Sequence, residues 1–557
     1  MSFSRKDIIH ITLLFILLLI PNLCALVMAI DMEGSMVMKT GYLGMVGVGL
    51  LLPALILKTR TYFIFEGLFS FLFMPIDIAS LYLNKQSASK LFLNSILNTD
   101  LLEAFEVLHS MWPICLAVLL LWGIYIYLCI IIPNLPLFNS KLRGWGFLAI
   151  LITALATYGG QTFLIKKINP TFTFREVISQ STEKFGMKFL KIYPYNLYIN
   201  THLLWQDKKA WNQAQDELST FSFGINKRDS IDNTLYLLYI GEATRYDHLA
   251  INGYERNTTP YLLQEKNIIS FTSIYTQANL TNYSIPYMLT RASVDNTDIL
   301  HKEKSLLEAF QEAGYHAAYI SNSSYFPFTM RIMHSCDYYH IFNRGMDAVN
   351  NYDINLVYKA IDHYNSNGQI ILLHSLGSHF KYSIRYPADF SYFLPASKPT
   401  DGYDIINEEN KSLLVNTYDN SIRYTDYVLH ELISWMDSLD NAAVLIYISD
   451  HGESFWDDDR KLSLHGSYEI SEAEYHVPCF IWYSNEFQQQ QPQKIYTLEK
   501  NKHIPQNSST IFHTLLHLAD IVEIVDSTKS LCSTYVQPLD TFKVLSGAGE
   551  IKTYVIQ

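Results

Sequence analysis

Long apolar runs dominate residues 1–165, whereas the rest of the chain alternates short apolar runs with polar segments. A helix that crosses a bilayer needs about 20 mostly apolar residues. We therefore expect membrane-spanning helices at five stretches: Ile8–Ile30, Tyr42–Leu57, Tyr62–Leu83, Trp112–Ile132 and Trp145–Ile165. The alternative for the first stretch is a cleaved signal peptide, because a lysine precedes it and small residues follow.

Basic residues fall in alternate loops between these stretches, at Arg5–Lys6, Lys58–Arg60 and Lys141–Arg143. Loops rich in Lys and Arg stay in the cytoplasm. With five crossings, everything after Ile165 then lies outside, which in a bacterium is the periplasm. The pattern predicts a multi-pass membrane protein with a large external domain.

The chain divides into three predicted parts: a transmembrane domain at 1–165, an amphipathic connector at 166–232, and an α/β domain at 233–557. In the last part, apolar strand-like runs alternate with helical patterns, which is typical of a mainly parallel sheet covered by helices. Four strands are expected: Thr234–Ile240, Ala317–Ile320, Ile370–Leu373 and Ala443–Ile448.

The charge balance and the cysteines exclude two classes of site. The net charge of −12 and the lack of a basic stripe argue against a nucleic-acid partner, which requires clustered Lys and Arg. The six cysteines form no CxxC pair, so a metal site built from cysteines is not expected.

Ionisable side chains follow the predicted strands at their carboxyl ends, where open α/β sheets form their sites. Glu242 follows the first strand, and Asp450 and His451 follow the last. Imidazoles after the third strand and in a nearby Leu-His-Gly turn can reach the same edge: His374, His379 and His465. A lone histidine there is more often a hydrogen-bonded loop residue, but three converging strand ends favour a zinc site with nitrogen and oxygen ligands.

A segment rich in hydroxyl groups, Gln277–Pro286, lies between the first two strands and leads into a helix-like stretch. The N-terminus of a helix favours a bound phosphate, and a metal can activate a hydroxyl as a nucleophile. On chemistry alone Thr281 and Ser284 are equal candidates. Both can also be ordinary turn and capping residues.

Several motifs resemble those of the phosphoethanolamine transferases of Gram-negative inner membranes, within the alkaline phosphatase superfamily. Gly241–His248 and Asn252–Pro260 are similar to the family pattern GExxRxxH…NGYxRxTxP. Ser449–Ser454, Leu464–Gly466 and the TDxxEAxE-like run Asn98–Glu106 also match. The resemblance implies an alkaline phosphatase-like, sulfatase-type α/β domain in the periplasm, anchored in the inner membrane by a bundle of about five helices.

The resemblance also implies roles for individual residues. It makes Glu242, Asp450 and His451 ligands of one tightly bound zinc together with Thr281, and it makes Thr281 rather than Ser284 the nucleophile. Substrate-binding roles are implied for six further residues: His374, His379, His465, Asn322, Thr99 and Glu103. For His379 and His465 the alternative role is to bind a second zinc.

The activity implied is transfer of phosphoethanolamine from phosphatidylethanolamine, through a phosphothreonine, to lipid A, a lipopolysaccharide core sugar or another envelope glycan. A monomer is expected. The alternatives are a glycerol-phosphate transferase of the lipoteichoic acid synthase type and a non-catalytic envelope sensor or scaffold. Sulfatase activity is not expected, because the chain lacks Cys/Ser-x-Pro-x-Arg. Gln277 and Tyr287 stand where lipid A-modifying members have cysteines, so their disulfides are not expected here.

Overall fold

The structure is a computed structural model that forms two compact units. The first unit comprises Met1–Asn94 with Met111–Asp207, and the second comprises Ser95–Ser110 with Lys208–Gln557. The structure describes residues 3–28, 36–84, 87–98, 112–168, 172–187, 192–228, 233–323, 326–342, 351–365, 368–402 and 405–556.

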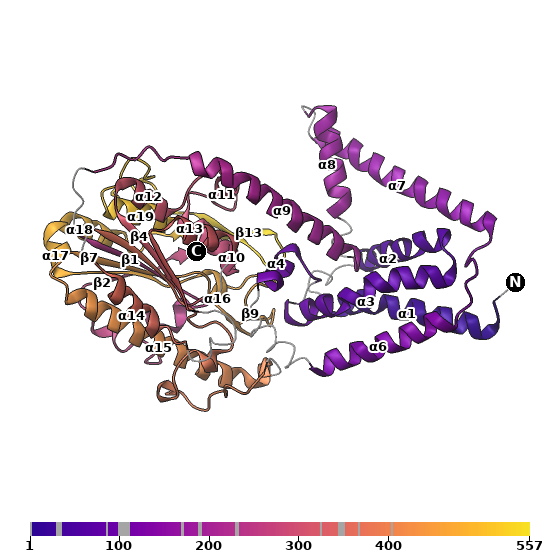
Figure 1. Ribbon diagram of the computed structural model, residues 1–557, viewed down its shortest axis with the longest axis horizontal. Helices are drawn as coiled ribbons and strands as arrows, with labels where there is room; N and C mark the ends of the chain where they lie inside the picture. Colours follow the sequence, from indigo (N-terminus) through magenta and orange to yellow (C-terminus); the bar gives the residue numbers. More distant parts are fainter. Residues whose placement is uncertain are drawn as a thin grey trace. The chain divides into compact units, whose positions relative to one another are not determined.

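The first unit is helical (Figure 1). Its helices are α1 (Arg5–Met28), α2 (Met36–Ile56), α3 (Thr59–Asn84), α4 (Lys90–Asn98), α6 (Trp112–Ile131), α7 (Ser140–Ile168), α8 (Phe174–Met187) and the beginning of α9 (Tyr195–Thr220). Within the described residues, all five predicted apolar stretches therefore fall in helices, apart from single residues at two helix ends.

Not all of these helices are long and apolar enough to cross a bilayer. Among the described residues, α1 and the segment Ser140–Lys167 meet that requirement. Helix α3 would be a third span if its halves, which meet at an angle of 54°, count as one. The apolar parts of α2 and α6 are shorter, at Tyr42–Ile56 and Cys115–Ile131. The count of five spans stays a prediction.

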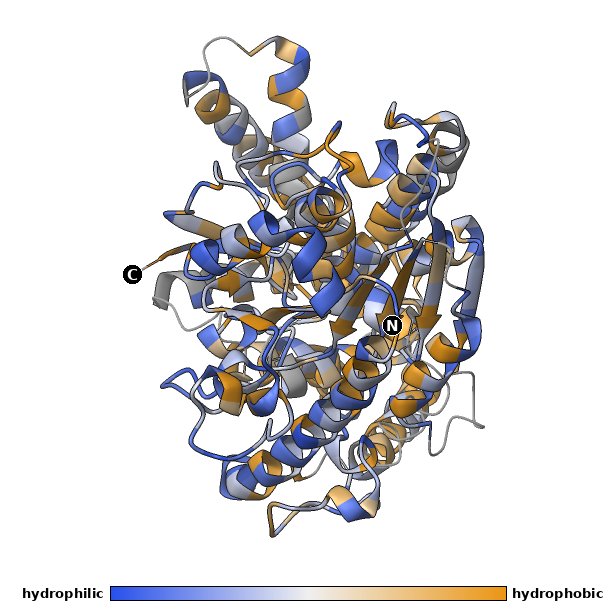
Figure 2. Cartoon of the chain, turned by 90° about the vertical axis from the view of Figure 1, so that its left-hand side faces the viewer, coloured by the Kyte–Doolittle hydropathy of each residue, from blue (hydrophilic) through white to orange (hydrophobic). Residues whose placement is uncertain are grey.

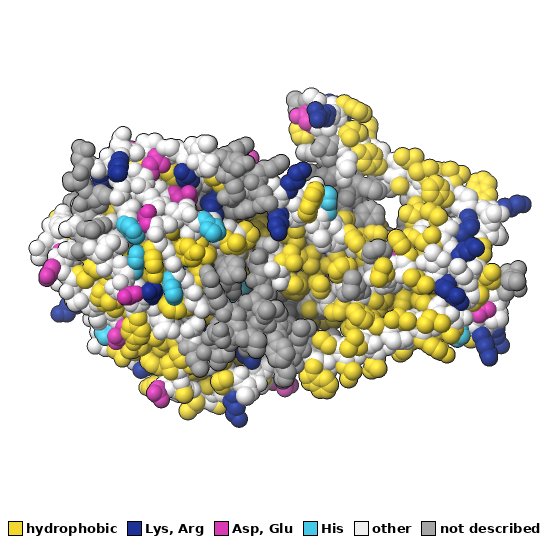
Figure 3. Space-filling model, in the orientation of Figure 1, with side chains coloured by type: hydrophobic (Ala, Val, Ile, Leu, Met, Phe, Trp, Pro, Cys, Tyr) yellow, Lys and Arg dark blue, Asp and Glu magenta, His cyan; other side chains and the backbone are white. Residues whose placement is uncertain are grey.

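Large apolar side chains cover the outside of this unit, and yellow dominates its visible face in Figure 3. On α6 and α7, Leu119, Leu120, Leu155 and Phe163 are 57–69% exposed. Single exposed apolar residues are normal on soluble proteins, but helices that are apolar all round belong in a core or a bilayer. The surface of these helices is therefore suited to contact with lipid chains.

Two of the basic loops lie at one end of the bundle. The Arg60 guanidinium donates to the carbonyl oxygens of Ile130 and Ile132, at the end of α6. Arg143 donates to the carbonyls of Ile56 and Leu57, at the end of α2. The last carbonyls of a helix lack partners within it, and a cation there also complements the helix dipole. Arg60 and Arg143 thus provide hydrogen-bond donors to the last carbonyl groups of α6 and α2.

Buried polar side chains tie the chain near Tyr193 into the bundle. Asn22 of α1 donates to the carbonyl of Tyr193 and accepts from its N–H and from the Tyr42 hydroxyl. Asp77 of α3 accepts from the side chain of Asn196 and from the backbone of Ala88. Because buried polar groups are costly unless bonded, these pairs fix where α9 begins.

The second unit is built on a seven-stranded sheet. Its strands run in the order β2 (Ile268–Phe271), β10 (Cys479–Tyr483), β7 (Ala443–Ser449), β1 (Leu235–Gly241), β6 (Gln369–His374), β4 (His316–Ser321) and β5 (Tyr338–Ile341). Strand β10 runs antiparallel to the other six strands of this sheet. The four predicted strands are confirmed as the neighbours β7, β1, β6 and β4.

Helices cover both faces of the sheet (Figures 1 and 2). The side chains of β1 alternate: Tyr236 and Leu238 pack in one apolar cluster, Leu235 and Leu237 in the other. The first cluster includes side chains of α10 (Thr281–Leu289), α12 (Leu306–Ala313), α13 (Pro327–Ser335) and α19 (Thr510–Leu518). The second includes those of α14 (Ile354–His363) and α15 (Lys411–Asp437). A parallel sheet buried on both faces explains the continuous apolar runs of its strands.

Shorter elements complete the second unit: α11 (Ile299–Lys302), α16 (Glu472–Tyr475), α17 (Asn485–Gln490) and α18 (Pro492–Asn501). Three small sheets pair β3 (Ile274–Tyr275) with β11 (Gln506–Asn507), β8 (Ser454–Phe455) with β9 (Ser463–Leu464), and β12 (Thr541–Leu545) with β13 (Ile551–Val555). Strand register places Ile240 beside His374, and Gly241 beside Ser449. The carboxyl ends of β1, β6 and β7 therefore meet at one edge.

Candidate active site and metal centre

Glu242 leaves the end of β1 in a constrained turn. The next residue, Ala243, has a φ of 55°, which residues other than glycine seldom adopt. Its N–H donates to Asp450 Oδ1 (3.1 Å), and its carbonyl accepts from the Tyr418 hydroxyl (2.6 Å). On the other side, a Cβ at Gly377 would lie 2.9 Å from the Glu242 backbone nitrogen. These contacts fix the Glu242 carboxylate at the edge of the sheet.

Glu242, Asp450 and His451 form a buried cluster whose ligand atoms all lie within 4.8 Å of one another. His451 Nε2 is 3.4 Å from Glu242 Oε1 and 3.3 Å from Asp450 Oδ2. His451 Nδ1 lies 2.9 Å from the Gly452 carbonyl, to which it donates as N–H. This bond leaves the Nε2 lone pair directed at the carboxylates, as a metal-binding histidine requires.

The charges of this cluster call for a cation. Burial, and then the nearby Asp450, raise the pKa of Glu242 well above its usual value. Asp450 Oδ2 is buried without a hydrogen-bond donor. Buried carboxylates this close are costly unless a positive charge compensates them. Two carboxylates and one imidazole suit zinc, so Glu242, Asp450 and His451 fit the ion that the sequence predicts.

Thr281 is the first residue of α10 and faces the same cluster. Its hydroxyl donates to Glu242 Oε2 (3.1 Å) and lies 3.2 Å from His451 Nε2. Ser284, one turn later, is fully buried and donates to the backbone carbonyl of Asp450 (2.6 Å). Of the two hydroxyls that chemistry alone left equal, the structure brings Thr281 to the carboxylates and engages Ser284 elsewhere.

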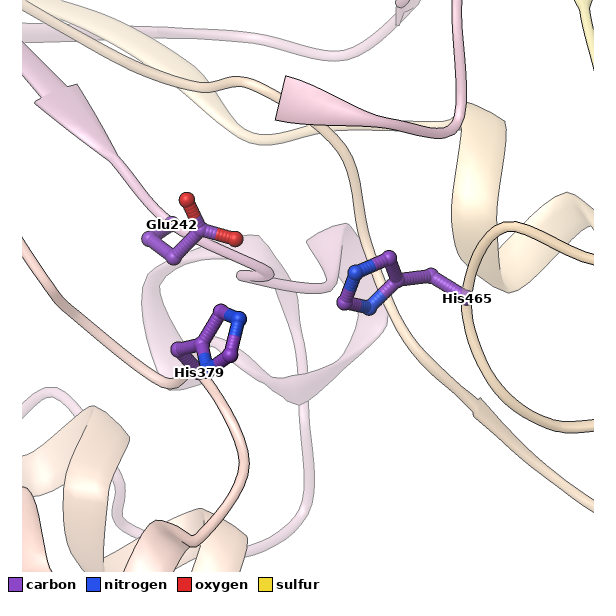
Figure 4. Close-up of side chains that lie close together, drawn as sticks. All are labelled: Glu242, His379 and His465. Atoms are coloured by element: carbon purple, nitrogen blue, oxygen red, sulfur yellow. The ribbon is translucent and has the colours of Figure 1, made fainter. Parts of the chain in front are cut away.

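His379 and His465 also lie close to Glu242 (Figure 4). One ligand atom from each of these three residues lies within 4.8 Å of the others. His379 Nδ1 donates to the Phe380 carbonyl (2.6 Å), and His465 Nδ1 lies 3.2 Å from Glu453 Oε1. Burial lowers the pKa of His379 to about 3, so its ring is neutral at neutral pH. The group offers two imidazoles and a carboxylate to a second cation or to a substrate.

His374 lies fully buried at the end of β6. Its Nδ1 is 2.9 Å from the Tyr319 hydroxyl, and its Nε2 has no hydrogen-bond partner. Burial lowers its pKa to about 4, so its ring is neutral at neutral pH.

Asn322 is linked through Asp353 to the loop that follows β6. Its amide donates to Asp353 Oδ1 (2.9 Å), and Asp353 accepts in turn from the N–H groups of Leu376 and Gly377. The Oδ1 atom of Asn322 has no partner and is the atom left for a ligand. The other two predicted headgroup residues, Thr99 and Glu103, lie outside the described residues.

Sequence reasoning missed two buried acids beside the site, Glu453 and Glu474. Burial raises the pKa of Glu453 to about 8 and that of Glu474 to about 7. Glu474 accepts a hydrogen bond (2.7 Å) from the side-chain amide of Asn279, which lies two residues before Thr281. The position of Glu453, two residues after His451, was a usable signal. No local signal in the sequence marked Glu474, because its partner Asn279 lies 195 residues away.

The motif residues that follow Glu242 brace the fold around the site. Asp419 of α15 is fully buried and accepts from Tyr254 (3.0 Å) and Arg256 (2.5 Å), and its other oxygen lies 2.7 Å from His248 Nδ1. These partners are three residues of the GExxRxxH…NGYxRxTxP match. The block therefore ties the turn after β1 to a long helix.

We expect Asp419→Ala to lower the free energy of unfolding of the second unit by about 3 kcal/mol, since it removes a fully buried carboxylate on which three side chains converge, among them the buried His248. Thermal unfolding of the purified chain measures the loss. The control is Asp298→Ala, which breaks an ion pair with Lys302 whose side chains are 75% and 64% exposed. Exposed pairs contribute little, so this variant should unfold like the wild type. Equal losses in both variants would contradict a bracing role for Asp419.

Comparison with known proteins supports the fold and the motifs. The family model described as Sulfatase matches residues 234–521. Kdo(2)-lipid A phosphoethanolamine 7''-transferase of Escherichia coli K12 is 30% identical over 275 residues, which are 48% of this chain and 47% of that protein. The chain thus spans about half the length of the curated relatives that it matches.

Two solved structures share the fold. The integral membrane protein lipooligosaccharide phosphoethanolamine transferase A from Neisseria meningitidis superposes with a TM-score of 0.63 at 21% identity, over 83% of this chain and 85% of that one. The periplasmic domain of EptC from Escherichia coli, in complex with Zn, gives a TM-score of 0.53 at 22% identity, over 60% and 95% of the two chains.

The resemblance found in the motifs is confirmed, and so is the sulfatase-type α/β domain. Helix α1 and the segment Ser140–Lys167 are long and apolar enough for a membrane-embedded first unit. Since the family model covers just over half of the chain, this protein belongs to the sulfatase family of the alkaline phosphatase superfamily, with phosphoethanolamine transferases of lipid A among its homologues.

Proposed function

We propose that this chain transfers phosphoethanolamine from phosphatidylethanolamine to lipid A, a lipopolysaccharide core sugar or another envelope glycan. The observation that carries the proposal is the Thr281 hydroxyl, held at the start of α10 at 3.1 Å from Glu242 and next to a cluster that calls for a cation. The homologues with this activity add support. The chain would reside in the bacterial inner membrane with its second unit in the periplasm.

The reaction has two displacements at phosphorus. In the first, Thr281 Oγ forms a bond to the donor phosphorus, and the bond from phosphorus to the diacylglycerol oxygen breaks. The proton lost by Thr281 is regained by that oxygen, which leaves as an alcohol. In the second, an acceptor oxygen attacks the phosphothreonine, the P–Oγ bond breaks, and Thr281 recovers a proton from the acceptor.

The other residues bind and orient. Glu242, Asp450 and His451, with Thr281, would hold zinc, which when bound favours the ionised hydroxyl and offsets charge on the phosphoryl oxygens. His379 and His465 would hold the substrate phosphate or a second zinc. The substrate-binding roles of His374, Asn322, Thr99 and Glu103 remain predictions.

Sulfate-ester hydrolysis is not supported, although the domain is of the sulfatase type. The hydroxyl in the sequence Ser284-Ile-Pro286 is followed by Met288 where Cys/Ser-x-Pro-x-Arg requires arginine. The Ser284 hydroxyl also donates to the backbone carbonyl of Asp450 and not to the carboxylates of Glu242 and Asp450.

Mass spectrometry of lipid A and envelope glycans tests the proposal in cells with and without the chain. We expect one class of molecules to gain the mass of phosphoethanolamine only when the chain is present, and to lose it again in cells carrying Thr281→Ala. A gain of glycerol phosphate instead would favour the alternative transferase. An unchanged envelope in cells that contain the folded protein would refute the proposed activity.

A further inference from the structure

The hairpin β12–β13 lies beyond residues 234–521, the part that the sulfatase family model matches. It is nevertheless docked firmly on the second unit. Phe542 is buried and stacks on Tyr275 with ring centroids 4.1 Å apart, and Val544 is fully buried. On β13, the Tyr554 hydroxyl donates to the Ile470 carbonyl (3.1 Å). The hairpin therefore packs on β3 and on the segment that follows His465.

The last residue of β12 is hydrogen-bonded to the segment that leads into Thr281. The Leu545 N–H donates to the Gln277 carbonyl (2.8 Å), and the Asn279 N–H donates to the Leu545 carbonyl (3.3 Å). Ala278 and Leu545 form an isolated parallel bridge. These backbone bonds end two residues before Thr281, so the hairpin sets the path on which the nucleophile enters α10.

The turn of the same hairpin touches the loop that carries His465. A Cβ at Gly547 would collide with the backbone of Gly466. A Cβ at Gly466, whose φ is 78°, would lie 2.8 Å from the side chain of Leu280. Gly466 is thus enclosed between the hairpin and the residue before Thr281. One close-packed layer joins Gly547, Gly466 and Leu280 and thereby sets the spacing between His465 and Thr281.

A second contact holds the same segment from the other side, because the Asn279 side chain donates to the buried Glu474 (2.7 Å). All six cysteines are free, so among the described residues no disulfide restrains the segment. Its position depends on hydrogen bonds and packing, and the backbone part of that restraint comes from the hairpin.

We propose that the β12–β13 hairpin is a positioning element of the active site, in which Leu545 fixes the segment before Thr281 and Gly547 fixes the loop of His465. The inference rests on the proposed function, which makes Thr281 the nucleophile and assigns His465 to the substrate phosphate or a second zinc. Leu545 and Gly547 are positioning residues, because both act through neighbours of Thr281 and His465. A misplacement of about 1 Å can cost a catalyst on the order of 100-fold in rate.

The test uses the full-length, zinc-loaded chain in detergent. Leu545→Pro removes the N–H that donates to Gln277, whereas Leu545→Ala keeps it. We expect Leu545→Pro and Gly547→Ala to lower kcat by about 10- to 100-fold, with KM and zinc content near wild type. Both variants should also unfold at a lower temperature, because one loses a backbone hydrogen bond and the other must move the turn away from Gly466. Leu545→Ala should retain most of the wild-type kcat. A wild-type kcat in both Leu545→Pro and Gly547→Ala would overturn the proposal.

Amide hydrogen exchange gives a readout that does not depend on the reaction. In Leu545→Pro, the Asn279 amide should exchange faster, while the amides of β1 and β7 keep their protection. Unchanged exchange at Asn279 would overturn the proposal, even if the wild type transferred nothing from phosphatidylethanolamine and the proposed function had failed. If Leu545→Pro does not fold, the kcat of Gly547→Ala decides, because this substitution removes no backbone N–H group.

Discussion

Thr281→Ala should lower transfer of phosphoethanolamine by at least about 1,000-fold, because no hydroxyl remains to attack phosphorus. Transfer is measured with labelled phosphatidylethanolamine and an acceptor extract from the envelope. Thr281→Ser should keep part of the rate, since the oxygen survives while the methyl group that restricts its rotamer is lost.

Ser284→Ala is the matched control for the nucleophile. It removes a buried hydroxyl that donates to the Asp450 carbonyl, so it should cost about 1–3 kcal/mol of stability and leave the chemistry largely intact. Thermal unfolding and the transfer assay separate these two effects. Full transfer by Thr281→Ala, or a loss in Ser284→Ala as deep as that expected for Thr281→Ala, would show that the wrong hydroxyl was chosen.

Asp450→Asn should release zinc while the fold survives. Asp450 Oδ1 accepts from the N–H groups of Ala243 and His451, and the amide oxygen of asparagine can keep both bonds. The second carboxylate oxygen, which has no donor, becomes an NH₂ group that cannot bind a metal. Elemental analysis should give about one zinc per wild-type chain and almost none in the variant.

Asp457→Asn is the control for charge, because Asp457 pairs with Arg245 at 2.8 Å and is not part of either metal-binding group. It should keep its zinc. Retention of zinc by Asp450→Asn at the wild-type level would remove Asp450 from the ligand set. Zinc loss in both variants would point to a general effect of charge on the second unit.

The central strands could be predicted from sequence because parallel strands buried on both faces are continuous apolar runs, as in Leu235–Ile240. The edge strand β5 could not, since its sequence Tyr338-Tyr-His-Ile341 is mostly half-exposed and carries no such run. In the first unit, the apolar runs predicted helices correctly. They did not establish how many helices span the bilayer, which depends also on the length and straightness of each helix.

The core of the site was predictable for a related reason. Glu242, Asp450 and His451 follow directly after apolar strands, so strand register alone brings them together. Their supporting partners come from distant parts of the chain, as with Asn279 and Glu474, and no local pattern connects them. The choice of Thr281 over Ser284 required the family resemblance, because both are hydroxyls near the start of one helix.

The most direct test of the proposed function is to trap the covalent intermediate. The purified chain is incubated with phosphatidylethanolamine and no acceptor, digested, and analysed by peptide mass spectrometry. We predict one phosphoethanolamine group on Thr281, no such group in Thr281→Ala or in zinc-free Asp450→Asn, and its disappearance when acceptor is added. An adduct on Ser284, or transfer that proceeds with no adduct on the chain at any time point, would contradict the mechanism.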